Sequence, residues 1–210
     1  MPEPVMQSPL HPFALAGEVK PVDGSKGVWA NELPLSGYIS LRGSAQDAAF
    51  VEATSGVLGV GLPTEPCTLA VSATAKVLWL SPDEWMIVCA RDRLAGLLRD
   101  LSRALAGIRS QVVDNSGGYT QVLVRGSNAR DLVSHVSVYD IGALEPDRVV
   151  GTTFGKSSLY VHRQDDGYCL MLRRSFADYI WRYLVRAAAP YGFGVARLEA
   201  VGDGVRRSAT

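Results

Sequence analysis

Hydrophobic and polar positions follow almost the same pattern at two places in the chain. Residues 36–44 read Ser-Gly-Tyr-Ile-Ser-Leu-Arg-Gly-Ser, and residues 116–127 begin Ser-Gly-Gly-Tyr and end Val-Arg-Gly-Ser. Apolar residues alternate with other residues after each tyrosine, which predicts a short strand with one buried face. Because the two copies lie about eighty residues apart, the pattern indicates an internal duplication.

The end of each repeated strand carries the signals of a helix start. The glycine of Arg-Gly-Ser lets the backbone turn sharply. The serine that follows, Ser44 or Ser127, is placed to accept hydrogen bonds from the first free amides of a helix. The boundary between the copies, residues 114–118, reads Asp-Asn-Ser-Gly-Gly and is typical of turns. We therefore expect two similar units, one after the other.

The first copy continues with a hairpin and a second helix. Pro82 in Ser-Pro-Asp favours a tight turn, and leucines at three- and four-residue spacing after Asp92 predict a helix with one buried face. We expect a helix over residues 44–54 and a loop over 56–66. Two hairpin strands over 76–80 and 84–90, a helix over 92–105 and a closing strand over 110–113 follow.

The second copy repeats that order. Asp166-Gly167 is a hairpin signal, and Pro190 closes an amphipathic helix that begins at Ser175. We expect a strand over residues 120–124 and a helix over 127–136. Two hairpin strands over 158–162 and 168–172, a helix over 175–187 and a last strand over 193–198 follow. This order is the split β-α-β pattern. The predicted fold class is α+β, with two tandem ferredoxin-like repeats, antiparallel sheets and helices packed on one side.

The chain divides into four segments on this interpretation. We expect an extended N-terminal arm over residues 1–35, the first repeat over 36–115, the second over 116–200 and a flexible tail over 201–210. The arm is proline-rich and aperiodic, yet it carries apolar residues, namely Leu10, Phe13, Leu15, Val28, Trp29 and Leu33. Such a segment is too apolar to stay free in water. It lies against its own domain or a partner subunit, and we expect the partner.

Charge and composition bear on the partners and the compartment. The 21 basic residues balance 21 acidic ones among 210 residues, and no basic stripe with interleaved aromatic residues is present, so we expect no nucleic acid partner. The first 17 residues resemble neither a signal peptide nor a membrane anchor, which favours a cytoplasmic protein. Cys67, Cys89 and Cys169 lack the spacing of a zinc site or disulfide framework, and we interpret them as packing thiols in a reducing compartment.

Histidines and paired carboxylates do not form a catalytic pattern. His11, His135 and His162 each stand alone, outside metal-ligand spacing, and are interpreted as polar surface or edge residues. Asp83 and Glu84 are adjacent on a turn and are expected to point apart into solvent.

Glycine-rich motifs are equally unspecific. Residues 56–61 lack the Gly-x-Gly-x-x-Gly order, and no Lys-Ser or Lys-Thr follows them. Ser116 lacks the flanking glycines of a nucleophile elbow. The sequence therefore predicts no catalytic, cofactor-binding or metal-ligating residue in this chain.

Three segments together resemble a known family. Residues 76–85 read Lys-Val-Leu-Trp-Leu-Ser-Pro-Asp-Glu-Trp, residues 114–116 read Asp-Asn-Ser, and a Gly-Tyr strand ending in Arg-Gly follows. The chain from about residue 35 to 193 is similar to the gamma subunit of heterotetrameric sarcosine oxidase, and the tryptophan-bracketed hairpin is the most specific part of that resemblance.

The resemblance implies a small subunit of a bacterial complex that demethylates sarcosine oxidatively. The complex gives glycine and hydrogen peroxide and passes the one-carbon unit to tetrahydrofolate when that acceptor is present. In that family FAD, FMN, NAD and zinc belong to the alpha, beta and delta subunits, and the folate site belongs to alpha. The gamma chain resembles in fold the folate-binding part of the glycine cleavage T-protein.

Two further hypotheses compete with a non-catalytic structural subunit. The first is a stand-alone folate-dependent aminomethyl or one-carbon transferase. We expect the chain to end after the second repeat, without a third domain, and this expectation argues against a transferase. The second is a folate-binding maintenance protein for iron-sulfur enzymes, which has a Lys-Gly-Cys-Tyr segment. The nearest counterpart here, residues 154–158, reads Phe-Gly-Lys-Ser-Ser.

Overall fold

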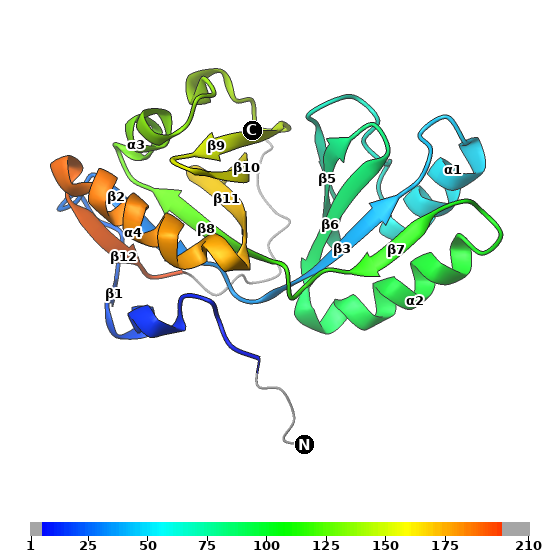
Figure 1. Ribbon diagram of the computed structural model, residues 1–210, viewed down its shortest axis with the longest axis horizontal. Coiled ribbons are helices and arrows are strands. Elements are labelled where there is room, and N and C mark those ends of the chain that lie inside the picture. Colours follow the sequence, from blue (N-terminus) through cyan, green and yellow to red (C-terminus); the bar gives the residue numbers. More distant parts are fainter. Residues whose placement is uncertain (1–5, 199–210) are drawn as a thin grey trace, which may run out of the picture.

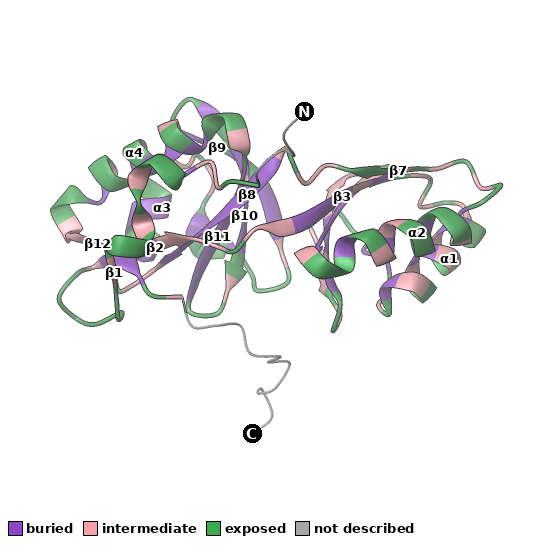
Figure 2. Cartoon of the chain, turned by 90° about the horizontal axis from the view of Figure 1, so that it is seen from below, coloured by how far each residue is buried: buried purple, intermediate pink, exposed green. Residues whose placement is uncertain are grey.

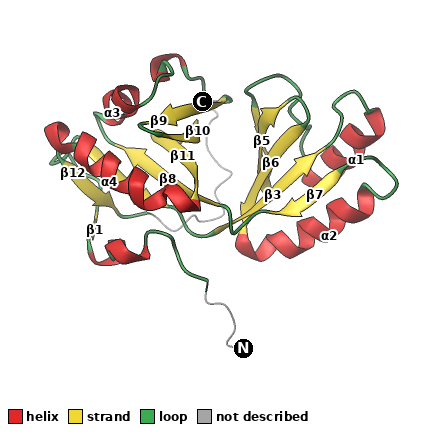
Figure 3. Cartoon of the chain, viewed as in Figure 1, coloured by secondary structure: helices red, strands yellow, loops and turns green. Residues whose placement is uncertain are grey.

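The computed structural model describes residues 6–198, which form two units whose sheets face each other. In Figure 1, helices α1 and α2 cover the outer side of one sheet, and α3 and α4 cover the outer side of the other. The same separation of helices and strands is visible in Figure 3. The predicted α+β class, with helices on one side of each sheet, is confirmed.

The first unit is a five-stranded antiparallel sheet with two helices. Its sheet order is β4-β5-β6-β3-β7, so the strands β3, β5, β6 and β7 have the ferredoxin-like arrangement and β4 adds an edge. Its elements are β3 (Ser36–Arg42), α1 (Ala48–Leu58), β4 (Leu69–Val71), β5 (Ala75–Ser81), β6 (Glu84–Ala90), α2 (Leu94–Ala104) and β7 (Gln111–Asp114).

The second unit has a seven-stranded sheet in the order β1-β12-β2-β8-β11-β10-β9. Its own elements are β8 (Tyr119–Arg125), α3 (Ala129–Val136), β9 (Val149–Phe154), β10 (Ser157–Gln164), β11 (Gly167–Arg173), α4 (Ala177–Ala187) and β12 (Phe193–Ala196). Two strands come from the N-terminal segment, β1 (Val19–Lys20) and β2 (Val28–Glu32). The 3-10 turns are His11–Phe13, Leu15–Gly17, Arg91–Arg93, Ile141–Ala143, Arg174–Phe176 and Ala189–Tyr191.

The expectation that residues 1–35 form an arm against a partner is wrong for the described part of that segment. Strand β2 pairs antiparallel with β8 and parallel with β12, and so lies between the two strands that would otherwise be neighbours in a ferredoxin-like unit. Leu10, Val28, Trp29 and Ala30 are buried within this chain. Backbone pairing and burial together make this segment part of the second unit.

Two expected helix caps are also wrong. The cap of α1 is Asp47, whose carboxylate accepts from the amides of Ala49 and Phe50, whereas Ser44 accepts from Gln46 in the turn before it. Asn128, not Ser127, precedes α3, and no side chain caps that helix. Helix α1 also continues to Leu58, past the expected loop start, and Gly59 ends it in the left-handed conformation at φ 66°.

Each unit buries its own core between sheet and helices, and Figure 2 shows the buried residues concentrated on the strands. In the first unit the Trp85 ring lies 5.6 Å from that of Phe50, and its indole N–H donates to the Pro63 carbonyl at 2.6 Å. In the second unit the N-terminal segment adds Phe13, whose ring lies 6.2 Å from that of Trp181 on α4. Both units are therefore packed domains that need no ligand to fill their centres.

Candidate functional site between the two units

A third apolar cluster joins the inner faces of the two sheets. The cluster is made of buried residues from both units, Tyr38, Leu78, Met86, Val88, Tyr119, Val149 and Met171. Tyr38 and Tyr119 are the tyrosines of the repeated Gly-Tyr motif, and their ring centroids are 5.9 Å apart. The duplicated motif therefore brings its two copies together at the centre of the molecule.

Backbone hydrogen bonds also join the units at the edges of their sheets. The amide of Leu69 donates to the carbonyl of Asp147 at 2.9 Å, and the amide of Val149 donates to the carbonyl of Cys67 at 2.9 Å. Thr68 and Arg148 form an isolated antiparallel bridge between them. This short ladder fixes the loop after α1 against the loop before β9.

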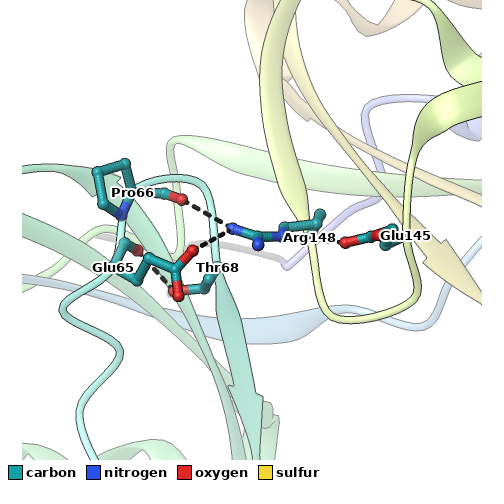
Figure 4. Close-up of polar contacts among 5 residues, drawn as sticks. All are labelled: Glu65, Pro66, Thr68, Glu145 and Arg148. Carbon is teal, nitrogen blue, oxygen red and sulfur yellow. Dashed lines mark hydrogen bonds and ion pairs between the residues drawn. The ribbon is translucent and has the colours of Figure 1, made fainter.

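Arg148 adds side-chain contacts across the same edge (Figure 4). Its guanidinium group lies 3.0 Å from the Glu65 carboxylate, 3.3 Å from the Pro66 carbonyl and 3.5 Å from the Glu145 carboxylate. The two carboxylates are exposed and Arg148 is partly buried, so water screens these contacts, and they orient the loops more than they stabilise the fold.

A partly buried lysine from one unit meets a buried histidine from the other. Lys76 on β5 places its Nζ 3.4 Å from His162 Nε2 and 3.0 Å from Gln164 Oε1, both residues of β10. His162 Nδ1 lies 2.9 Å from the Arg163 carbonyl, which can only accept, so Nδ1 carries the proton and Nε2 accepts from Lys76. The imidazole is therefore neutral and bridges the units.

Burial explains the acid–base properties of this pair. Desolvation, and then the Lys76 charge, lower the pKa of His162 to about 4. Desolvation also lowers the pKa of Lys76. The interpretation of His162 as a surface or edge residue is wrong, because the first unit covers the hairpin that carries it. The other two histidines, His11 and His135, are exposed.

The cysteines differ in environment. Cys89 and Cys169 are buried, as expected, and burial raises the pKa of the Cys169 thiol to about 12. Cys67 is exposed and occupies a turn at φ 61°, so its expected packing role is wrong.

The remaining residues considered as candidates from the sequence lie in turns or form contacts between strands. Ser116 accepts a hydrogen bond from the amide of Tyr38 at 3.0 Å, across the boundary between the copies. Asp83 pairs with Arg42 at 2.6 Å on an exposed turn, and Glu84 begins β6. Residues 56–61 cover the end of α1 and the turn after it.

A cavity of about 490 Å3 opens on the inner face of the second sheet. Three tyrosines, Tyr119, Tyr139 and Tyr160, line it with threonines and Met171, and the Arg173 guanidinium lies 5.4 Å from the centroid of the Tyr119 ring. Nearby Val138 is 85% exposed. The lining supplies a cation and aromatic faces but no acid–base pair, so it suits binding better than catalysis.

No cluster of potential metal ligands occurs among residues 6–198. Within the same described part of the chain, no helix is both long and apolar enough to span a membrane.

Comparison with known proteins gives one family and two informative structures. The sequence matches the sarcosine oxidase gamma subunit family over residues 42–190. The structure is similar to a chain of heterotetrameric sarcosine oxidase from Corynebacterium sp. U-96, in complex with pyrrole 2-carboxylate, with a TM-score of 0.78 and 23% identity, covering 93% of this chain and 99% of that one.

The second similar structure is the glycine cleavage system aminomethyltransferase T from Bartonella henselae, with a TM-score of 0.63 and 13% identity. The similarity covers 84% of this chain but 56% of the aminomethyltransferase. At these identities the two structures establish the fold. No curated protein matches the sequence.

Proposed function

The chain belongs to the sarcosine oxidase gamma subunit family, and from this premise we propose that it is the non-catalytic structural subunit of a heterotetrameric sarcosine oxidase. The match over residues 42–190 carries the proposal, because it spans most of both halves of the duplication and includes the tryptophan-bracketed hairpin. The similarity in fold to a chain of the Corynebacterium enzyme over almost its whole length supports it.

In the proposed complex the other subunits perform the chemistry. Alpha, beta and delta would hold FAD, FMN, NAD and zinc, and the complex would oxidise the N-methyl group of sarcosine, leaving glycine. Tetrahydrofolate would accept the one-carbon unit. The gamma chain would contribute a rigid two-unit body, supported here by the shared apolar cluster and the Lys76–His162 contact between the units.

The placement of the polar candidates is consistent with a structural role. His162 is held by Lys76 and by the Arg163 carbonyl, and Ser116 is held by the Tyr38 amide. Both residues are therefore engaged in contacts that join strands or units, where they serve packing and orientation.

The proposal is tested on the purified chain expressed alone. We expect a colourless protein that does not turn over sarcosine, and turnover when alpha, beta and delta are supplied. A visible absorption spectrum after gel filtration and a peroxide assay are the measurements. Flavin absorbance that stays with the chain, or sarcosine oxidation by the chain alone, contradicts the proposal.

The same preparation tests the transferase alternative. Tetrahydrofolate-dependent release of a one-carbon unit from an aminomethyl donor by the chain alone would favour an independent transferase. We expect no such activity, because the tyrosine-lined cavity of the second sheet supplies no acid–base pair.

A further inference from the structure

The internal duplication places equivalent residues around one small pocket. Tyr38 and Tyr119 come from the two copies of the Gly-Tyr motif. Arg91 directly follows β6, and Arg174 directly follows β11, the corresponding strand of the second unit. All four residues line a cavity of about 220 Å3 at the boundary between the units. The pocket therefore has an arginine and a tyrosine from each half of the molecule.

The two arginines have few partners within the protein. Both are half-buried, and neither forms an ion pair with any residue in the range 6–198. Arg174 donates one hydrogen bond, to the Gln7 carbonyl at 2.6 Å. The side chain of Arg91 has no hydrogen bond to a described residue. Guanidinium groups carry five donors each, so most of this donor capacity is unused.

One carboxylate beside the pocket, Glu32, is already engaged. Glu32 accepts hydrogen bonds from the hydroxyl of Ser8 and, at 2.5 Å, from that of Thr120, one of the lining residues. Its two oxygens are thus satisfied by hydroxyl groups, and it does not pair with either arginine among the described residues.

We propose that this pocket binds the carboxylate of a small organic acid or of another polypeptide, with Arg91 and Arg174 as its paired cationic ligands. Two guanidinium groups on one small pocket repel each other unless an anion lies between them, and they hold carboxylates through charge-assisted, often bidentate hydrogen bonds. Leu35, Met6 and the tyrosine rings supply the apolar part of the lining. That mixture fits an organic acid better than an inorganic ion. The pocket lies within this chain, so binding of a carboxylate does not depend on the proposed function, whereas the test of its source in the last experiment does.

Malonate is the probe for the site. We expect malonate, at ionic strength matched with chloride, to raise the unfolding temperature of the full-length chain and to bind in calorimetry. Arg91→Gln and Arg174→Gln are each expected to weaken binding at least about tenfold, and the double variant to abolish it. Arg93→Gln is the matched control, because Arg93 is exposed and does not line the pocket.

Arg174→Gln also removes the hydrogen bond to the Gln7 carbonyl, and so it can weaken binding indirectly. Arg91→Gln is free of this effect, because the Arg91 side chain has no hydrogen bond to a described residue. The site is rejected if malonate binds the double variant as well as it binds the original chain, or if it binds neither.

The source of the carboxylate is distinguished by co-purification of the chain with its partner subunits in excess malonate. Loss of the partners in malonate, but not in chloride, assigns the carboxylate to a partner chain. Retention with malonate bound assigns it to a free organic acid.

Discussion

Trp85 shows how much of the stability of the first unit depends on one side chain. It is fully buried, packs on Phe50 and donates to the Pro63 carbonyl. Replacing it with alanine leaves a large cavity and an unpaired carbonyl, so we expect Trp85→Ala to lower the free energy of unfolding by roughly 3–5 kcal/mol. Urea unfolding measures this. Trp79→Ala is the control, because Trp79 is only partly buried. Equal losses for the two variants would contradict the account of the core.

His162 gives the molecule a defined acid sensitivity. Its pKa falls from 6.5 to about 4 on folding, through burial and then the Lys76 charge, with the Arg163 carbonyl opposing them. A lowered pKa means that the folded state favours the neutral form. The stabilisation is therefore complete above pH 6.5 and is lost as the pH falls from 6.5 to about 4.

Unfolding free energies measured across that pH range test the assignment. The loss is expected to be on the order of 3 kcal/mol, by the usual conversion of a pKa shift. His162→Gln is expected to flatten the profile, whereas His135→Gln, at an exposed position, is expected to leave it unchanged. A profile that His162→Gln does not alter would show that another group causes the acid sensitivity.

Residue environments were the least predictable level from sequence. Cys89 and Cys169 lie in apolar runs, and their burial follows from that pattern. His162 lies beside a hairpin turn, which indicates solvent, and its burial depends on a strand more than eighty residues away. Local sequence carries no signal for such a contact.

At the scale of elements, strand β2 is an integral part of the sheet of the second unit. It lies between β8 and β12, and its Val28 and Ala30 belong to the core of the second unit. A chain that begins at Ser36 is therefore expected to lose the packing of that unit, because the edges of β8 and β12 and an apolar surface are exposed.

Near-ultraviolet circular dichroism and limited proteolysis measure this loss. Val22→Ala, in the same segment but at an exposed position, is the control and is expected to behave as the unaltered chain. A truncated chain with native signals from the second unit would show that β2 is dispensable.

Periodic elements and the closing strands β7 and β12 were predicted correctly, whereas β1, β2, β4 and β9 were not predicted. The amphipathic helices and both hairpins follow from spacing and turn residues, and their bounds agree within a few residues. Strand β2 reads Val-Trp-Ala-Asn-Glu, which has no clear alternation, and its partners lie far along the chain. The cap of α1 was misplaced because Ser44 and Asp47 are both good capping residues in the same turn.

At the scale of the whole molecule, the duplication predicts two units but not how they meet. Their contact is built from a tyrosine of each copy, the Lys76–His162 pair and the short ladder beside Arg148. These residues are mixed polar and apolar, although they lie in corresponding elements of the two copies, β3 and β8 for the tyrosines and β5 and β10 for Lys76 and His162. No motif in the sequence indicates an active site. The family resemblance was therefore the main indication of function.

The assembly state of the chain, expressed together with the alpha, beta and delta subunits, decides whether it is the gamma subunit of such a complex. An affinity tag on this chain, followed by size-exclusion chromatography and native mass spectrometry, identifies what it binds. We expect one complex that contains one copy of each subunit and oxidises sarcosine. Elution of this chain by itself, while the other three subunits form a complex of full activity, would contradict this expectation.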